Sequence, residues 1–367
     1  MERVLVCVLG ATRAHELTFP SFKRQVLDEL NGDLAMALTI DEKYNYANPF
    51  WQHAKYRWTG PDFSDYGEGF DLAQRWLCQQ YKVPAPDWRS MLRLKGMWQA
   101  RIASPAPQPG SASILFFIRW LLLHGLQQDN VLDRYDRFVI TRSDFVWLGP
   151  HPPLSVLDKD AIWFPDGEYY GGLTDRHLVV SRADVVNCLN IIEDILLQPI
   201  QLYEDMKDLP TWDQYGWNIE QFLQHHLCRK GLLHKVKLFP YVMYLARSVR
   251  DDGSRTWSLG SYEPAVGHFV KYEEEFRAAS AYATIIHSRA DWETGVWRQF
   301  DPSSAARRPD SFPRLLRYAC ERPYETYYWI RSALNETLSE TYYWIRSALR
   351  RPGRFGRLAR FSKRMQR

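Results

Sequence analysis

The chain opens with an apolar run, an amphipathic stretch and a second apolar run, and this order limits the fold more than any other feature. Residues 4–9 and 34–40 have the continuous apolar pattern of strands that are buried on both faces. Residues 22–30 between them have the spacing of a helix, with Ser21 as the expected cap. Because strand–helix–strand units build parallel sheets, we expect an α/β fold.

Further apolar runs and helical patterns follow this opening. Strands are expected at residues 138–141, 161–164, 178–181 and 236–239, and helices at residues 111–126, 185–197 and 218–227. The aromatic segment 44–70 is rich in turn residues and is expected to be a long surface excursion. Together these patterns predict one α/β domain over residues 1–295.

Composition excludes several classes of protein. The five cysteines are odd in number and far apart, which argues against a disulfide framework and a zinc knuckle and indicates a reducing, cytosolic setting. The chain has no glycine-rich dinucleotide motif, no P-loop and no serine-hydrolase elbow. Its 15 Trp and 21 Tyr are unusual. Such rings stack on sugars and bases, although a Trp-rich core is the alternative.

The C-terminal part differs in composition from the rest. Residues 296–324 read as a linker, and residues 325–367 as a helical repeat followed by a basic amphipathic tail. The ten residues 325–334 recur letter for letter at 340–349. The tail, residues 350–367, carries eight Lys or Arg and no acid, with apolar residues between them. It fits a helix on an anionic lipid surface; a solvated tail is the alternative.

A polar triplet follows the predicted strand at residues 138–141. Arg142, Ser143 and Asp144 stand at its carboxyl end, where open α/β sheets bind ligands. One carboxylate there suits a hard divalent cation that takes its other ligands from phosphate oxygens. Asp144 is therefore a candidate ligand of Mn²⁺ or Mg²⁺ in a metal–diphosphate site, with a solvated strand end as the alternative.

The densest polar segment, residues 166–177, lies between two predicted strands. Asp175 or Glu168 can act as a general base toward an acceptor hydroxyl. The glycine pair at 171–172 lets the backbone approach a ligand closely. The alternative is a loop whose acids cap turns and pair with Arg176. Arg13, after the first strand, can hold a diphosphate through its guanidinium, or it can be an exposed loop residue.

With these residues the chain resembles bacterial and algal glycosyltransferase-like proteins of the GT-A type. The resemblance spans residues 1–290 and rests on residues 6–13, 135–145 and 171–177. It implies a GT-A-like, Rossmann-like α/β/α sandwich with a mixed central sheet, followed by a helical C-terminal extension. The chain departs from the family's Asp-x-Asp because Arg142 stands in the place of the first Asp. Arg142 can itself offset phosphate charge.

The resemblance and the residues together assign four groups of site residues. The catalytic group is Asp175, followed by Glu168 and Asp166. The nucleotide and diphosphate group is Thr12, Arg13, Asp41 and Arg142. The sugar and acceptor group is Trp163, Tyr170, Gly172 and His177. The metal ligand is Asp144.

The expected activity is transfer of a sugar from a nucleotide-diphosphate donor to a hydroxyl of a glycan or lipid-linked acceptor. We expect a cytoplasmic protein that the tail can hold on the inner face of a membrane, and no nucleic-acid partner, because the chain's net charge is only +4. Two alternatives remain. One is a non-catalytic carbohydrate-binding protein that uses the Trp-rich segment, and the other is a membrane scaffold that acts through the repeat and tail.

Overall fold

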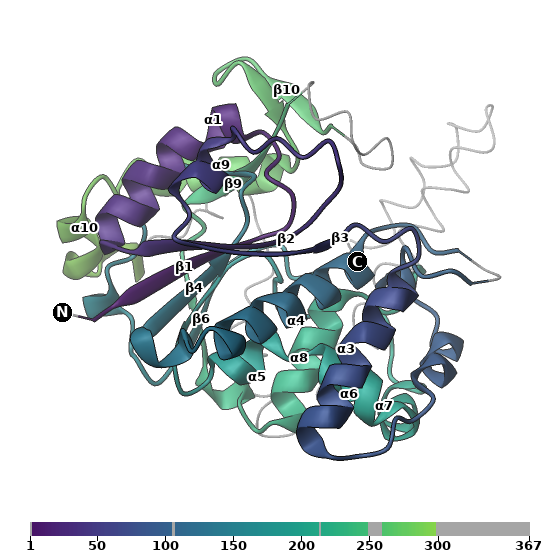
Figure 1. Ribbon diagram of the computed structural model, residues 1–367. Coiled ribbons are helices and arrows are strands. Elements are labelled where there is room, and N and C mark those ends of the chain that lie inside the picture. Colours follow the sequence, from purple (N-terminus) through teal and green to yellow (C-terminus); the bar gives the residue numbers. More distant parts are fainter. Residues whose placement is uncertain (1, 105–106, 213, 249–258, 299–367) are drawn as a thin grey trace, which may run out of the picture. The chain divides into compact units, whose positions relative to one another are not determined.

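A seven-stranded mixed sheet forms the centre of the fold (Figure 1). Its strands lie in the order β3 (Tyr56–Pro61), β2 (Asp33–Ile40), β1 (Val4–Leu9), β4 (Arg137–Thr141), β7 (Leu178–Ser181), β6 (Ile162–Pro165) and β8 (Val236–Phe239). The first four are parallel to one another, β7 runs antiparallel between β4 and β6, and β6 and β8 are parallel again. The predicted α/β class with a mixed sheet is confirmed.

The computed structural model describes residues 2–104, 107–212, 214–248 and 259–298. These residues belong to one unit of the chain, which extends over residues 1–308. Most of the predicted linker, from residue 299 to 324, the repeat and the basic tail lie outside the described residues.

Helices cover both faces of the sheet. They are α1 (His15–Phe22), α2 (Pro49–His53), α3 (Tyr66–Tyr81), α4 (Ala112–Gln128), α5 (Val185–Leu189), α6 (Ile192–Leu197), α7 (Pro199–Met206), α8 (Ile219–Arg229), α9 (Glu273–Tyr282) and α10 (Arg289–Thr294). Figure 1 shows α3, α4, α5 and α8 on one side of the sheet and α1, α9 and α10 on the other. No helix in the described part combines the length and apolarity needed to cross a bilayer.

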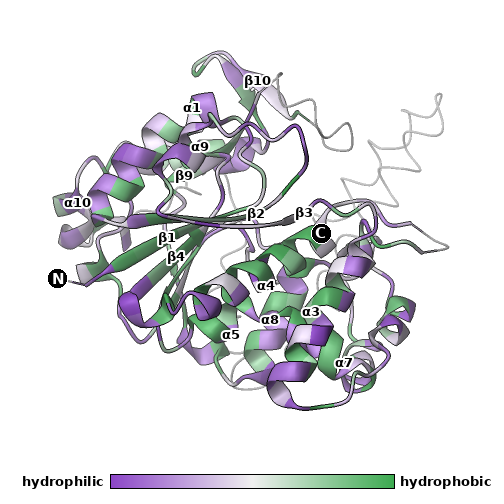
Figure 2. Ribbon diagram, in the orientation of Figure 1, coloured by the Kyte–Doolittle hydropathy of each residue, from purple (hydrophilic) through white to green (hydrophobic). Residues whose placement is uncertain are grey.

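The apolar residues of β1 explain this layering. Every residue of the strand is buried, and Val4, Val6 and Val8 share a core with Phe19 and Phe22 of α1. On the other face α4 lies directly on the sheet: a Cβ on Gly125 would come within 2.4 Å of the Trp58 ring. Figure 2 shows the apolar character of β1, β4 and α4. The sheet is therefore buried on both sides, as its continuous apolar strands predict.

A second, four-stranded sheet extends from the end of β4. Its order is β10 (Ser261–Glu263), β11 (His268–Val270), β9 (Met243–Arg247) and β5 (Phe145–Trp147). The amide of Ala246 donates to the carbonyl of Asp144 (2.9 Å), and the amide of Lys271 donates to the carbonyl of Leu245 (2.9 Å). This sheet therefore brings residues 245–247 and 271 beside the triplet at 142–144.

Three expectations about elements were wrong. Segment 44–70 contains β3, an edge strand of the main sheet whose residues are all exposed or half-buried, so it lacks the continuous apolar run of a central strand. Ser21 is no cap: the first helix begins at His15 and continues past Phe22 as a π-helical turn, and the Ser21 hydroxyl donates to the Thr18 carbonyl. The predicted helix at 185–197 is two helices, because α5 ends at Leu189 and α6 begins at Ile192.

Candidate functional site

The predicted site segments lie at one edge of the main sheet. The segments that carry Arg13, Asp41, Asp144 and Asp166 follow β1, β2, β4 and β6, whose carboxyl ends share that edge because these strands are parallel. Asp175 comes directly before β7, and β7 is antiparallel to β4, so its amino end lies at the same edge. Polar residues that are far apart in the sequence thus lie at the same edge of the main sheet.

The chain changes direction in the sheet between β1 and β4. From β1 it proceeds outward to β2 and β3, and it then returns to β4 on the other side of β1. Open α/β sheets bind ligands at such a switch point, outside the carboxyl ends of the strands. Here the Ser143 hydroxyl donates to the Ala11 carbonyl (2.9 Å). This bond holds the loop of Arg13, which is half-buried, against the loop of Asp144.

Asp144 lies between two guanidinium groups. Its Oδ1 accepts from Arg142 Nε (3.0 Å), and its Oδ2 accepts from Arg142 Nη2 (2.9 Å) and Arg247 Nη1 (2.8 Å). Burial alone would raise the pKa of Asp144, which is 2% exposed, but the two arginines hold that pKa far below its ordinary value. Asp144 therefore stays ionised and fixes the orientation of Arg142, whose side chain is 20% exposed.

This arrangement does not fit a divalent cation at Asp144. Both carboxylate oxygens already accept hydrogen bonds from cationic donors, and a cation there would lie beside two positive charges. The metal role of Asp144 stays a prediction, and no step proposed below depends on it.

A second buried ion pair lies in the same region. Arg176 Nη1 donates to Glu275 Oε1 of α9, and the amide of Leu245 donates to the other carboxylate oxygen (3.3 Å). The guanidinium of Arg176 also lies 4.6 Å from the centre of the Tyr272 ring and donates to the Tyr170 hydroxyl (3.4 Å). Arg176 thus joins loop 166–177 to α9 and does not pair with the acids of its own loop.

The pKa values of Lys271 and Glu220 are shifted in opposite directions. Burial and the positive charges of Arg176, Arg142 and Arg247 lower the pKa of Lys271 to about 7. Burial and the charge of Asp175 raise the pKa of Glu220 to about 8. Groups shifted in this way, in one place, are typical of functional sites.

Positive charge exceeds negative charge in this cluster of buried and half-buried side chains. Five are basic and four are acidic: Arg119, Arg142, Arg176, Arg247 and Lys271, with Asp144, Asp175, Glu220 and Glu275. Arg142 and Lys271 are the half-buried members, and the others are buried behind them. The accessible side of the cluster is therefore cationic and suits an anion.

The loop that follows β6 has a strained backbone. Glu168 (φ 53°), Tyr170 (φ 45°) and Gly171 (φ 77°) all adopt left-handed conformations, which are costly for side chains other than glycine. Glu168 and Tyr170 are half-buried, whereas Asp166 is exposed and accepts a hydrogen bond from the Tyr169 hydroxyl. Strain of this kind is retained where neighbouring structure fixes a functional loop.

Gly171 and Gly172 of this loop approach the protein itself, which differs from the expectation of close ligand approach. A Cβ on Gly172 would lie 2.1 Å from the Glu220 carbonyl oxygen, and one on Gly171 would lie 2.7 Å from the Cβ of Trp212. The amide of Leu173 donates to the same Glu220 carbonyl (3.1 Å). Gly172 thereby allows α8 to bring Glu220 next to Asp175.

Comparison with models of known protein families gives no match, and comparison with curated proteins gives none either.

Some predicted residues are not brought into the cluster. Trp163 lies in the hydrophobic core. Its indole donates to the carbonyl of Asp158 (3.0 Å), a residue that precedes β6. His177 is fully buried: its Nδ1 shares a hydrogen bond with Thr141 Oγ1 (3.0 Å), and its ring packs against Trp147. Neither side chain is placed to contact a sugar.

Thr12 and Asp41 lie at the correct edge but have local partners. The Thr12 hydroxyl is 3.5 Å from the Tyr44 hydroxyl. Asp41 is exposed and accepts from the amide of Lys43 (2.9 Å). Their nucleotide-binding role stays a prediction.

Five charged residues of the cluster were missed by sequence reasoning. They are Arg119, Glu220, Arg247, Lys271 and Glu275. Arg119 alone left a signal, since it interrupts the apolar run of α4, and its guanidinium donates to the Asp175 carbonyl. Glu220, Arg247 and Glu275 stand on α8, β9 and α9, and Lys271 follows β11; their local sequence is ordinary, and the second sheet and the two helices bring them in.

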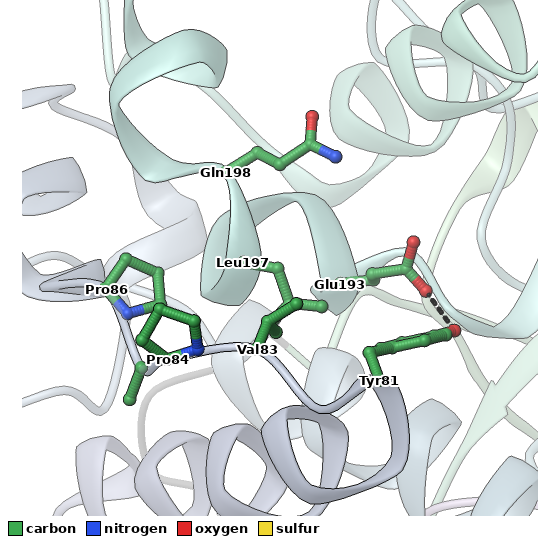
Figure 3. Close-up of a pocket in the computed structure, with 8 residues that line it drawn as sticks. Tyr81, Val83, Pro84, Pro86, Glu193, Leu197 and Gln198 are labelled. Carbon is green, nitrogen blue, oxygen red and sulfur yellow. Dashed lines mark hydrogen bonds between the residues drawn. The ribbon is translucent and has the colours of Figure 1, made fainter.

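Two further features of the described structure lie away from this edge. A pocket of about 500 Å³ is lined mainly by apolar side chains from residues 81–86 and by Leu197 of α6, with Glu193 at one side (Figure 3). None of the predicted site residues lines it.

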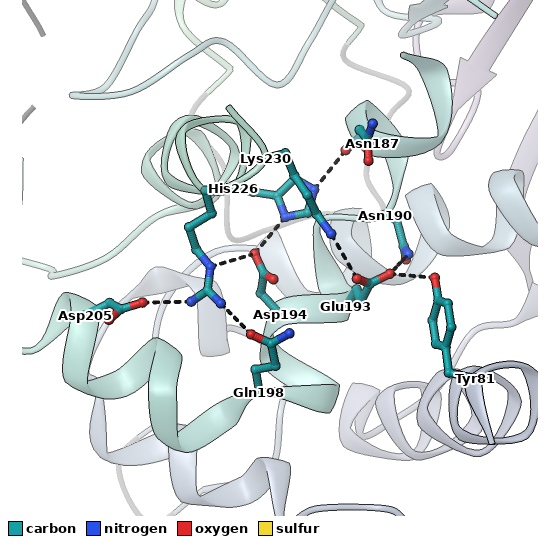
Figure 4. A network of polar contacts seen from close by, with 10 residues as sticks. Tyr81, Asn187, Asn190, Glu193, Asp194, Gln198, Asp205, His226 and Lys230 are labelled. Atoms are coloured by element: carbon teal, nitrogen blue, oxygen red, sulfur yellow. Dashed lines mark hydrogen bonds and ion pairs between the residues drawn. The ribbon is translucent and has the colours of Figure 1, made fainter. Parts of the chain in front are cut away.

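The second feature is a polar network between α6 and α8 (Figure 4). His226 Nδ1 lies 2.7 Å from Asp194 Oδ2, and its Nε2 lies 2.9 Å from the Asn187 carbonyl. The Asp194 carboxylate and the Asn187 carbonyl thus occupy both ring nitrogens. With both nitrogens occupied, His226 joins two helices and has a structural role.

Proposed function

We propose that the chain is a glycosyltransferase of the GT-A type that uses a nucleotide-diphosphate sugar. The observation that carries the proposal is the cationic face formed by Arg142 and Lys271 at the switch point between β1 and β4. A mixed seven-stranded sheet is compatible with the GT-A architecture. The loop of Arg13 lies against the same point, and Arg13 is the candidate for a further guanidinium.

In the proposed reaction an acceptor hydroxyl oxygen bonds to the anomeric carbon while the bond between that carbon and the diphosphate oxygen breaks. The diphosphate leaves with the electron pair, and Arg142 and Lys271 stabilise its charge; such preorganised electrostatic stabilisation is often the largest catalytic contribution. Asp144 and Arg247 keep Arg142 in position. Asp175 takes the hydroxyl proton, with Glu168 or Asp166 as the next candidates.

The test is release of nucleoside diphosphate. Purified protein is incubated with UDP-glucose, UDP-N-acetylglucosamine or GDP-mannose and a mixture of oligosaccharides, and the released diphosphate is measured with and without EDTA. We expect release from one donor that depends on acceptor and persists in EDTA. Arg142→Gln should abolish it, whereas Arg24→Gln, an exposed arginine on the first helix, should not. Equal activity in the two variants would contradict the proposal.

The carbohydrate-binding alternative depended on the aromatic segment 44–70, and its contacts do not favour it. The Trp58 indole donates to Asp129 (2.8 Å), and Trp51 packs against Tyr44 and Tyr46. These rings are engaged with the protein, so no second function is proposed from them.

A further inference from the structure

Trp212 exposes 58% of its surface, more than any other tryptophan that the structure describes. It lies on the loop at residues 207–218, between α7 and α8, and Tyr215 on the same loop is 48% exposed. Large rings are usually buried, because water contact with their apolar surface is unfavourable. Two exposed rings within four residues therefore need an explanation.

The exposed ring lies beside the candidate site. A Cβ on Gly171 would come within 3.2 Å of Cγ and of Cε3 of Trp212, so the indole rests against the backbone of this glycine. Gly171 follows Tyr170, whose hydroxyl accepts from Arg176 of the cluster. Trp212 is therefore next to the strained loop that also carries Glu168.

The end of the tryptophan's loop is fixed by the protein. The amide of Trp217 donates to the Lys95 carbonyl (3.2 Å), and a Cβ on Gly216 (φ 80°) would lie 2.4 Å from the same carbonyl oxygen. The Asn218 side chain donates to the Tyr170 carbonyl (2.9 Å) and caps α8. The contacts at Gly216 and Trp217 fix the end of the loop against Lys95, and Asn218 ties it to loop 166–177, against which Trp212 packs at Gly171.

We propose that Trp212, with Tyr215, forms the acceptor-binding platform and that its ligand is a sugar ring of an oligosaccharide. A sugar presents an apolar face that can cover an indole, and hydroxyls that suit the carboxylates and tyrosines next to it. This inference rests on the proposed glycosyltransferase function. The platform lies against Gly171, whereas the proposed diphosphate-binding residues are Arg142 and Lys271.

The test measures two bindings independently. Binding of cellohexaose, chitohexaose and mannohexaose is followed by saturation-transfer NMR, and binding of UDP and GDP by calorimetry, for the wild type and three variants. Trp212→Ala should weaken glycan binding at least about tenfold and leave diphosphate binding unchanged. Trp212→Phe should retain most glycan binding. Ile200→Ala, which removes another exposed apolar side chain (67%), should change neither.

The outcomes separate the two proposals. Glycan binding that is absent in the wild type, or equal in the wild type and Trp212→Ala, overturns the platform. Loss of diphosphate binding in Trp212→Ala overturns it as well, because the ring would then hold the nucleotide. Absence of diphosphate binding in the wild type contradicts the proposed transferase and leaves a glycan-binding surface at Trp212.

Discussion

The Asp144 carboxylate accepts hydrogen bonds from the guanidinium groups of Arg142 and Arg247, and replacing Asp144 removes these bonds. Because the pair with Arg247 is buried, Asp144→Ala should lower the free energy of unfolding by about 3 kcal/mol. Turnover should be lost as well, since Arg142 would no longer be oriented. Urea denaturation followed by circular dichroism measures the first effect. Asp28→Ala, which breaks an exposed pair with Lys23, is the control and should change stability little.

The stability that Asp144 contributes also depends on pH. Its pKa is lower in the folded chain than in the unfolded chain, so the contribution is present above the unfolded value and is lost as the pH falls toward the folded value. Wild-type stability should therefore decline in acid below about pH 4. The decline should be smaller in Asp144→Ala, and equal acid sensitivity in both proteins would contradict the role given to this residue.

Lys271 should make diphosphate binding depend on pH. Its pKa of about 7 lies below the ordinary value, and a bound anion would raise it, so binding draws a proton from solution. At pH 8 we expect uptake of up to about one proton per diphosphate bound. Titration calorimetry in two buffers of different ionisation enthalpy measures this uptake. The Lys271→Met variant should bind the diphosphate more weakly and take up fewer protons on binding. Proton release on binding by the wild type would contradict the role assigned to Lys271.

Residues differ in how well the sequence predicts their place in the fold. Asp144, Arg142 and Asp175 could be placed at one edge of the sheet, because each stands close to a buried apolar strand. Lys271 and Glu220 could not, because the second sheet and α8 carry them in from distant parts of the chain. The core position of Trp163 was not predicted, because the sequence of a short strand does not show whether an aromatic side chain faces the core or a ligand.

At the scale of elements, loop 166–177 and loop 207–218 come into contact at Gly171, where the absence of a side chain leaves room for Trp212. Gly171 and Gly267 have similar left-handed backbones (φ 77° and 74°), but only at Gly171 would a Cβ meet a neighbour. Gly171→Ala and Gly267→Ala should therefore share the backbone penalty of about 1–2 kcal/mol. Only Gly171→Ala should also displace Trp212 and weaken binding of oligosaccharides, which NMR titration measures. Equal glycan binding in the two variants would show that Trp212 does not depend on this contact.

Strands were predicted with the correct bounds where a single pattern of apolar residues dominates the segment. The strands at residues 4–9, 178–181 and 236–239 have the bounds expected from their apolar runs. β3 was missed because it is an edge strand without a buried apolar run. Its side chains alternate between exposed and half-buried positions, and its structure depends on pairing with β2. In the second sheet, β5, β10 and β11 have three residues each, too few to show a period.

At the scale of the whole molecule, the candidate site lies within residues 1–298, and the basic tail is separate in the sequence. A chain that ends at residue 308 should bind nucleoside diphosphates as well as the full chain does. It should lose binding to vesicles that contain phosphatidylserine, because the tail's eight cations are absent. Vesicle sedimentation and calorimetry measure the two properties. Loss of diphosphate binding on truncation, with the fold retained by circular dichroism, would favour the scaffold alternative.

The central claim is that charged groups from separate strand ends form one diphosphate site at the switch point of the sheet. A crystal structure of the full chain with the nucleoside diphosphate that binds most tightly in titration tests it most directly. The account predicts phosphate oxygens within hydrogen-bonding distance of Arg142 and Lys271. A nucleotide bound instead in the pocket lined by Tyr81 and Glu193, or no bound nucleotide at saturating concentration, would contradict it.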